Sequence, residues 1–411
     1  MKVFIGLNNI ASVFSDLKNG FSDLGIDTFI VSRYISSSVI IHDYADFNTA
    51  KVKDSLPTLK PRILNSLVRK VWGKLVDAYI FRKAVKECDV FVFISSSFRE
   101  DFADLEYLKR KGKKIVCVFV GDDVRWFFAM EQEFKKHGLA PIEYDIDGLK
   151  TQVALKERLT RIRTCERYSD FIFSRLDQGQ LQLRPYYRWN MMVNAKQINE
   201  NRAQRKVRPI VAHAPSDRSI KGTKYVLRAI EELKNEGYDF AVKLIENVPN
   251  EKAVELYSDV DIVIDQLLCP GTGKLATEAL ASGAVVMANM SYDNYPQKNP
   301  ADCPIVDVNP STIKEELASL INDYERRSEL AARGRAYVDK YLDIRIFCKK
   351  VINLIEGQPI QYDYIPSFFR NDYTPISEDE KELLNQWNAC IQNEEWYGEF
   401  VADGEREGLK F

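Results

Sequence analysis

Short strand-like runs alternate with helical patterns along most of this chain, and this alternation limits its fold more than any other feature. A helical pattern at Asp16–Leu24, closed by Gly25, follows the first such run and predicts a connecting helix. Strands that alternate with helices form βαβ units and parallel sheets. Buried strands of this kind, rich in Val, Ile and Phe, are predicted at Lys2–Gly6, Thr28–Ser32, Asp89–Ile94, Lys114–Val120 and Asp170–Phe173.

The alternation restarts after a polar, basic stretch at 194–208, which we interpret as a linker. The second half predicts strands at Pro209–His213, Phe240–Ile245, Asp261–Leu267, Val285–Ala288 and Pro304–Val308. Its predicted helices are Thr223–Asn235, Asn250–Ser258, Leu275–Ser282 and Ser311–Tyr324. The pattern predicts an α/β protein of three parts, with domains over 1–205 and 206–350 and a crossover helix with an acidic, aromatic-rich tail over 351–411.

The tail is too aromatic for plain disorder. We expect it to dock on the body through Tyr362, Phe368, Phe369, Trp387 and Trp396.

Composition excludes several classes of protein. The 411 residues carry 58 basic and 60 acidic side chains, which excludes a generally basic nucleic-acid binder. No apolar run approaches the roughly 18 residues of a membrane span, and the N-terminus lacks the apolar core of a signal peptide. Seven scattered Cys without a CxxC pair and only three His predict neither a disulfide framework nor a metal site. A cytoplasmic protein fits these features best.

Residues 269–288, CPGTGKLATEALASGAVVMA, hold the most informative motif. They do not form a P-loop, because that pattern needs Gly where Leu268 stands and Ser or Thr where Leu275 stands. A glycine turn that leads into a helix still suits a phosphate, because free N–H groups point at the anion. We expect this site at Gly271, Thr272, Gly273 and Lys274, with Glu278 accepting hydrogen bonds from a sugar diol. The alternative is a simple turn followed by a solvated helix Glu.

A second polar loop, VAHAPSDRSIKGTKYV, begins at 211. Arg218, Lys221 and Gly222 lie where we expect the next helix to start, and cations are unfavourable at a helix N-terminus. An anion between the two cations would explain them, since Arg binds phosphate bidentately and Lys acts as a point charge. The alternative is a pair of solvated cations.

Together these segments resemble the C-terminal half of GT-B glycosyltransferases of the retaining family 4, or group 1, type. The likeness covers about residues 205–350 and includes YVLRAIEELKNEG, ELYSDVDIVIDQ, the GTGK-to-Glu278 segment and LAARGRAYVDKYLD. It implies two Rossmann-like domains facing across a cleft, a nucleoside-diphosphate-sugar donor such as a UDP-sugar, and no metal or other cofactor. Glu278 would hold the ribose, Lys221 and Arg218 the diphosphate, and the Gly271–Gly273 loop the sugar and phosphates.

The match to the family's paired glutamates is partial. The first of the two family glutamates would stand at position 270, where this chain has Pro270, so only the second glutamate has a counterpart, Glu278.

The first half offers candidates for the acceptor side. Asp122 and Asp123 follow a predicted strand and could orient or deprotonate an acceptor hydroxyl, or could be a cap or turn. The loop after the first strand, with Gly6, Asn8 and Asn9, resembles the family's loop near acceptor and phosphates. Four basic side chains could meet an anionic acceptor but fit solvated faces better: Arg125, Arg158, Arg161 and Arg163.

The segment 60–87 predicts a basic amphipathic helix. Such a helix can lie on an anionic membrane or can cover the first sheet with its apolar side. Its apolar stripe comprises Leu64, Leu67, Val68, Val71, Trp72, Leu75, Val76, Tyr79 and Ile80.

The expected function is therefore transfer of a sugar from a nucleotide-sugar to a hydroxyl of a saccharide, which can be lipid-linked, in cell-surface polysaccharide assembly. We expect a cytoplasmic enzyme that can lie at the inner face of the membrane. The alternatives are a nucleotide-sugar epimerase on the same fold and a non-catalytic scaffold, which Pro270 suggests.

Overall fold

A computed structural model describes residues 1–33, 44–54, 62–121, 123–136, 147–175, 181–200, 208–291 and 301–364, together with positions 138, 378, 381, 382 and 385. The chain forms two compact units. Unit 1 comprises residues 1–129, 147–189 and 347–411, and unit 2 comprises 130–146 and 190–346.

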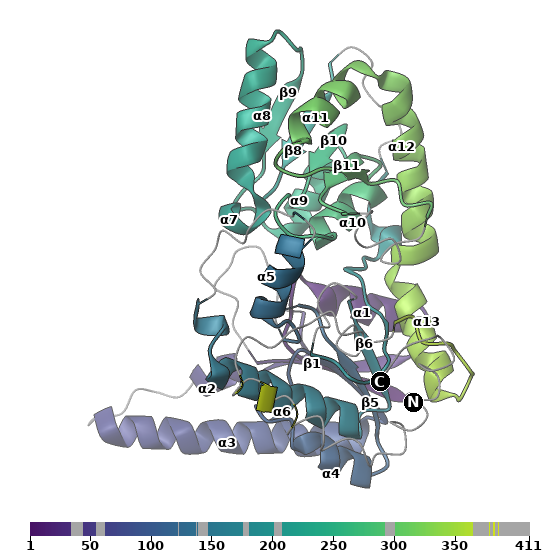
Figure 1. The fold of residues 1–411 in the computed structure, drawn as a ribbon. Coiled ribbons are helices and arrows are strands. Elements are labelled where there is room, and N and C mark those ends of the chain that lie inside the picture. The colour runs from purple at the N-terminus through teal and green to yellow at the C-terminus, as the bar shows by residue number, and fades with distance from the viewer. Residues whose placement is uncertain are drawn as a thin grey trace. The chain divides into compact units, whose positions relative to one another are not determined.

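Unit 1 is built on a parallel sheet of seven strands in the order β3-β2-β1-β4-β5-β6-β7. Its core strands are buried on both faces, which explains their unbroken apolar sequences. The strands are β1 (Lys2–Leu7), β2 (Asp27–Ser32), β3 (Phe47–Asn48), β4 (Val90–Ile94), β5 (Lys114–Val118), β6 (Phe171–Ser174) and β7 (Tyr187–Arg188). Its helices are α1 (Val13–Ser22), α2 (Thr49–Asp54), α3 (Arg62–Glu87), α4 (Asp104–Arg110) and α6 (Gln152–Tyr168) (Figure 1). Two helices are divided between the units: the chain leaves unit 1 within α5 (Phe127–Lys136) and returns to it within α13 (Ile344–Ile355).

Unit 2 is built on a parallel sheet of five strands in the order β12-β11-β10-β8-β9. Ile262 and Ile264 of β10 pack with α8 and α11 on one face, and Val263 packs with α9 and α10 on the other. The strands are β8 (Ile210–His213), β9 (Ala241–Leu244), β10 (Ile262–Ile264), β11 (Val285–Ala288) and β12 (Val306–Asp307). The helices are α7 (Arg218–Lys221), α8 (Thr223–Asn235), α9 (Asn250–Tyr257), α10 (Lys274–Ala281), α11 (Ile313–Asn322) and α12 (Tyr324–Tyr337), followed by a π-helical turn at Val338–Leu342.

The predicted α/β class and both parallel sheets are confirmed. The helix predicted at Thr223–Asn235 matches α8 residue for residue, and the strand predicted at Val285–Ala288 matches β11. The two-residue strands β3 and β7 were not predicted, because two residues carry no periodicity.

The predicted strand at Asp261–Leu267 and the predicted linker at 194–208 both differ from the structure. The strand expected to run to Leu267 ends at Ile264, so that Asp265 and Gln266 belong to the loop that follows it. The first part of the expected linker is packed in unit 2, where Ala195 is buried and accepts a hydrogen bond from Arg335.

Part of the tail runs beside the last strand of unit 1. Tyr364 and Tyr186 form an isolated antiparallel bridge, and the Arg188 N–H donates to Asp363 at 2.7 Å. The rings of Tyr362 and Tyr187 lie 4.9 Å apart. The expected docking residues Phe368, Phe369, Trp387 and Trp396 lie outside the described residues.

Candidate functional site

The second sheet has its topological switch point between β8 and β10. From β8 it passes to β9 on one side, and it then returns to β10 on the other side. Ligands of open α/β sheets bind outside the carboxyl ends of the strands at such a switch point. The loop after β8, at 214–222, belongs to the segment that the sequence singled out from 211, and the loop after β10, at 265–273, leads into the motif at 269–288.

A buried ion pair joins these two loops. Lys221 Nζ lies 2.6 Å from Asp265 Oδ1 and 3.0 Å from Gln266 Oε1. The Asp265 side chain is fully buried, and that of Lys221 is 11% exposed. Asp265 Oδ2 also accepts from the Gly273 N–H at 3.0 Å, so one carboxylate binds both the lysine and the start of α10.

The glycine turn closes tightly around this pair. A Cβ at Gly273 would lie 2.8 Å from Lys221 Nζ and 3.1 Å from Asp265 Oδ2, so no other residue fits without displacing them. Gly271 adopts a φ of 104°, which favours glycine, and its carbonyl accepts from Gln266 Nε2 at 2.6 Å. Thr272 lies between these two glycines, and Lys274 opens α10.

The predicted polar loop around Arg218 is a one-turn helix, α7. Asp217 caps it by accepting from the Ser219 and Ile220 N–H groups. Lys221 therefore lies at the C-terminal end of α7, where a cation is favourable. It also directly precedes Gly222, the N-cap of α8, so the next helix starts where the sequence predicted. Gly222, with a φ of 70°, makes the left-handed turn from α7 into α8.

Arg218 has a carboxylate partner of its own. Its guanidinium makes two hydrogen bonds, of 2.8 and 2.6 Å, to Glu246 after β9. The Arg218 side chain is 57% exposed, so this pair adds little stability. A phosphate bound by Arg218 would have to replace Glu246.

Glu278 is buried in α10 and is not the solvated helix residue of our alternative interpretation. Its Oε1 accepts from Asn250 Nδ2 at 2.9 Å, which ties α10 to the start of α9. Burial, with the Glu278 charge nearby, raises the pKa of Tyr257 far above its usual value.

His213 ends β8, and each of its two ring nitrogens has a hydrogen-bond partner. Its Nδ1 lies 2.8 Å from the Ile264 carbonyl, which can only accept, so Nδ1 carries the proton. Nε2 then accepts from the Thr223 hydroxyl at 2.9 Å. Burial lowers the pKa of His213.

Unit 1 places Asp123 at the carboxyl edge of its own sheet, after β5. The carboxylate accepts from Ser95 Oγ at 2.6 Å and from the Gly121 N–H at 2.8 Å. Burial outweighs these hydrogen bonds and raises the pKa of Asp123. Asp122 lies outside the described residues.

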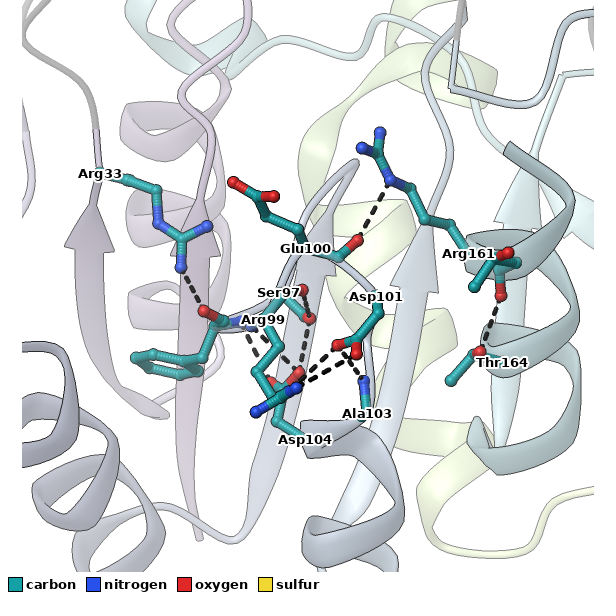
Figure 2. A network of polar contacts seen from close by, with 11 residues as sticks. Arg33, Ser97, Arg99, Glu100, Asp101, Ala103, Asp104, Arg161 and Thr164 are labelled. Carbon is teal, nitrogen blue, oxygen red and sulfur yellow. Dashed lines mark hydrogen bonds and ion pairs between the residues drawn. The ribbon is translucent and has the colours of Figure 1, made fainter. Parts of the chain in front are cut away.

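The loop after β4 forms a second polar cluster at this edge (Figure 2). Buried Asp104 accepts from Ser97 Oγ at 2.7 Å and from the Phe98 N–H at 3.1 Å. Arg33 donates to the Phe98 carbonyl, and Arg161 donates to the Glu100 carbonyl. These contacts fix the loop at 95–104 beside the end of β2. The sequence interpretation missed Asp104, because its partners lie within a loop that has no motif.

The loop after β1 begins later than expected. Gly6 lies inside β1, where a Cβ would meet the Phe4 ring at 2.8 Å, so packing accounts for this glycine. Asn9 accepts from the Phe14 N–H at 3.1 Å and holds the start of α1. Asn8 Oδ1 is buried without a hydrogen-bond partner among the described residues.

The expectation of solvated arginines in the first half was wrong for three of them. Arg125, Arg158 and Arg163 are buried. The first two lie over the Phe127 ring, and Arg163 pairs with the fully buried Glu166 at 2.8 Å.

The structure thus brings together Lys221, Gly273 and the start of α10 in unit 2, and it places Asp123 by itself in unit 1. The main residue that the sequence interpretation missed is Asp265. An acidic residue directly after a buried strand was the available signal.

The described residues contain neither a candidate metal site nor a candidate membrane span. No three His, Cys, Asp or Glu side chains there converge on a common point, and no helix is long and apolar enough to cross a membrane.

Comparison with known proteins gives likeness in structure only. No protein-family model matches the chain, and no curated protein matches it in sequence. A variant of TarM from S. aureus, solved with fondaparinux, α-GlcNAc-glycerol and UDP, has a TM-score of 0.54 at 10% identity, with 87% of this chain and 100% of that one covered. Sucrose-phosphate synthase from Thermosynechococcus elongatus has a TM-score of 0.53 at 13% identity, with 87% and 99% covered.

A putative UDP-N-acetylglucosamine 2-epimerase from Listeria monocytogenes matches at a TM-score of 0.50 and 12% identity, covering 89% of this chain and 99% of its own. TarM, sucrose-phosphate synthase and a putative epimerase therefore share this architecture. Two parallel-sheet units and these matches over nearly the whole chain show that the protein has the GT-B fold.

Proposed function

We propose that this chain is a glycosyltransferase that moves a sugar from a nucleoside-diphosphate sugar to a hydroxyl of a saccharide, which can be lipid-linked. Its role would be the assembly of a cell-surface polysaccharide or glycoconjugate. The observation that carries this proposal is the cluster of Lys221, Asp265 and Gly273 at the switch point of the second sheet. TarM, which shares the fold, was solved with UDP.

The diphosphate would bind at the glycine turn. The leaving nucleoside diphosphate gains negative charge as the glycosidic bond breaks, and fixed N–H dipoles and cations stabilise that charge. The turn at Gly271–Gly273 and the first N–H groups of α10 supply the dipoles. Lys221 has three N–H donors, and Asp265 and Gln266 accept from two, so the third is our candidate for a phosphate oxygen.

Asp265 sets the direction of the lysine without taking part in the reaction. Because the carboxylate is fixed by the Gly273 N–H, Lys221 Nζ is held beside the turn before any donor arrives. Such preorganisation reduces the reorganisation needed when charge develops. Glu278, one helical turn from Lys274, would hold the ribose hydroxyls.

On the acceptor side we propose Asp123, or its neighbour Asp122, as the group that orients or deprotonates the acceptor hydroxyl. The raised pKa of Asp123 increases its affinity for a proton. We also propose transfer without a metal and with retention of configuration. Activity that persists in EDTA and an NMR assignment of the product anomer test these two points.

A donor screen tests the whole proposal. The protein is incubated with UDP-, GDP- and ADP-sugars, with and without saccharide acceptors, and nucleotide release is measured. Release that requires an acceptor supports the transferase, whereas isomerised sugar without release supports an epimerase. Failure to bind any nucleotide sugar overturns both the transferase and the epimerase and favours a non-catalytic scaffold.

Two variants separate the roles of the residues. Glu278→Gln should weaken nucleotide binding, while Glu231→Gln, at an exposed site on α8, should leave it unchanged. Asp123→Asn should lower the transfer rate and leave nucleotide affinity unchanged. Equal nucleotide affinity in wild type and Glu278→Gln would refute the ribose assignment.

A further inference from the structure

The helix α3 exposes an apolar ridge on unit 1. The described residues expose ten large apolar side chains, and four of them lie within residues 71–79. Val71, Leu75 and Tyr79 are 52%, 58% and 61% exposed, and Trp72 beside them is 37% exposed. This clustering is unusual, because exposed apolar residues are normally scattered.

The predicted apolar stripe is in fact divided between two sides of the helix. Val76, Ile80 and Ala84 are buried in the core of unit 1, which satisfies the interpretation that α3 covers the sheet. Val71, Leu75 and Tyr79 share the same spacing of four residues but start one position away from that series, which turns them about 100° around the helix. Covering the sheet therefore does not account for them.

Basic side chains continue the same ridge. Arg82 follows Tyr79 by three residues and Lys86 follows it by seven, so both fall on the face of Val71, Leu75 and Tyr79. Both are exposed, as are Lys70 and Lys74 beside the apolar part. Figure 1 shows α3 running along the border of unit 1, with α4 near its C-terminal end.

We propose that this ridge, Val71, Leu75, Tyr79, Arg82 and Lys86, binds the surface of an anionic lipid bilayer. An interfacial helix inserts apolar side chains below the headgroups while its basic side chains meet anionic lipids. A single convex helix face suits a bilayer, whereas a stable protein interface needs roughly 800 Å² per partner with complementary packing. The proposal is independent of sugar transfer, and its failure would leave the donor site untouched.

Vesicle flotation of the full chain tests the proposal. Vesicles of phosphatidylcholine with phosphatidylglycerol should carry the protein upward at low salt, and vesicles of pure phosphatidylcholine should carry far less. Leu75→Ser should lower the partition coefficient roughly tenfold, and Lys86→Ser roughly fivefold. The Lys86→Ser effect should shrink in high salt, because exposed charges are screened.

Matched controls come from α6 of the same unit. Val153→Ser removes a side chain that is 68% exposed, and Lys156→Ser removes an exposed lysine, and neither should change flotation. Equal flotation of wild type and Leu75→Ser, or equal binding to both vesicle types, would overturn the proposal. Self-association that Leu75→Ser abolishes, in a protein that does not float, would identify the ridge as a protein interface instead.

Discussion

Lys221 and Lys252 provide a matched pair of ion pairs that differ in burial. Each lysine lies 2.6 Å from a carboxylate, Lys221 from Asp265 and Lys252 from Glu255. The first pair is 11% and 0% exposed and the second is 59% and 65% exposed. The two substitutions Lys221→Met and Lys252→Met therefore compare the same contact in two environments.

Lys221→Met should destabilise unit 2 by about 3–5 kcal/mol, because it strands the fully buried Asp265 charge. For a unit of this size that corresponds to a fall in Tm of roughly 6–20 °C. Lys252→Met should change stability by less than about 1 kcal/mol. The double substitution Lys221→Met with Asp265→Asn should recover much of the loss, since it removes the stranded charge and keeps an acceptor for the Gly273 N–H.

Hydrogen exchange by mass spectrometry, read on peptides that cover β10 and β11, measures the stability of unit 2 directly. Tryptophan fluorescence provides the internal control, because all five tryptophans lie outside unit 2. Its unfolding transition should stay in place in Lys221→Met. Equal protection in the two single variants, or a double variant less stable than Lys221→Met, would show that the buried pair does not hold these loops together.

Three further outcomes follow from the same site. Gly273→Ala should lower nucleotide affinity and destabilise unit 2 by about 1–3 kcal/mol, because the new Cβ would lie 2.8 Å from Lys221 Nζ. Calorimetry measures the loss of stability. Gly148→Ala is the control, since a Cβ at Gly148 would have no atom within 4 Å. Half-buried Cys269 should react with iodoacetamide, and UDP should slow that reaction if the turn binds a diphosphate, as peptide mapping would reveal. Burial lowers the pKa of His213, so its contribution to stability is present above about pH 6.5 and is lost as the pH falls below that value. The urea midpoint of unit 2 should therefore fall from pH 7.5 to 5.5, and a His213→Asn protein should show a smaller pH slope.

The regular elements could be predicted because local residues determine them. α8 has an apolar face at helical spacing and lies between Gly222 and Gly237, both at positive φ. Both ends of this helix can therefore be predicted from local residues. The ends of buried strands were harder to place. The sequence returns to apolar residues at Leu267 after Asp265 and Gln266, so a strand that continues past Ile264 was a reasonable prediction. The backbone shows that Asp265 has left β10.

The partners within the site could not be predicted for a different reason. Lys221 and Asp265 are 44 positions apart, and the sheet order that joins their loops depends on packing of the whole unit. The same holds for the Arg163–Glu166 pair, whose burial depends on the segment at 181–184. Motifs identified the loops, whereas burial and pairing decide which atoms in those loops have partners.

The division of unit 1 into three segments imposes an order on its synthesis. The Phe347 ring packs 4.8 Å from Phe173 and 4.9 Å from Trp189, yet unit 2 lies between them in sequence. A ribosome therefore finishes unit 2 before it delivers the aromatic side chain that completes the core of unit 1. During translation the earlier unit stays open at Trp189 and Phe173, and a chain stopped before residue 347 would keep that apolar surface exposed.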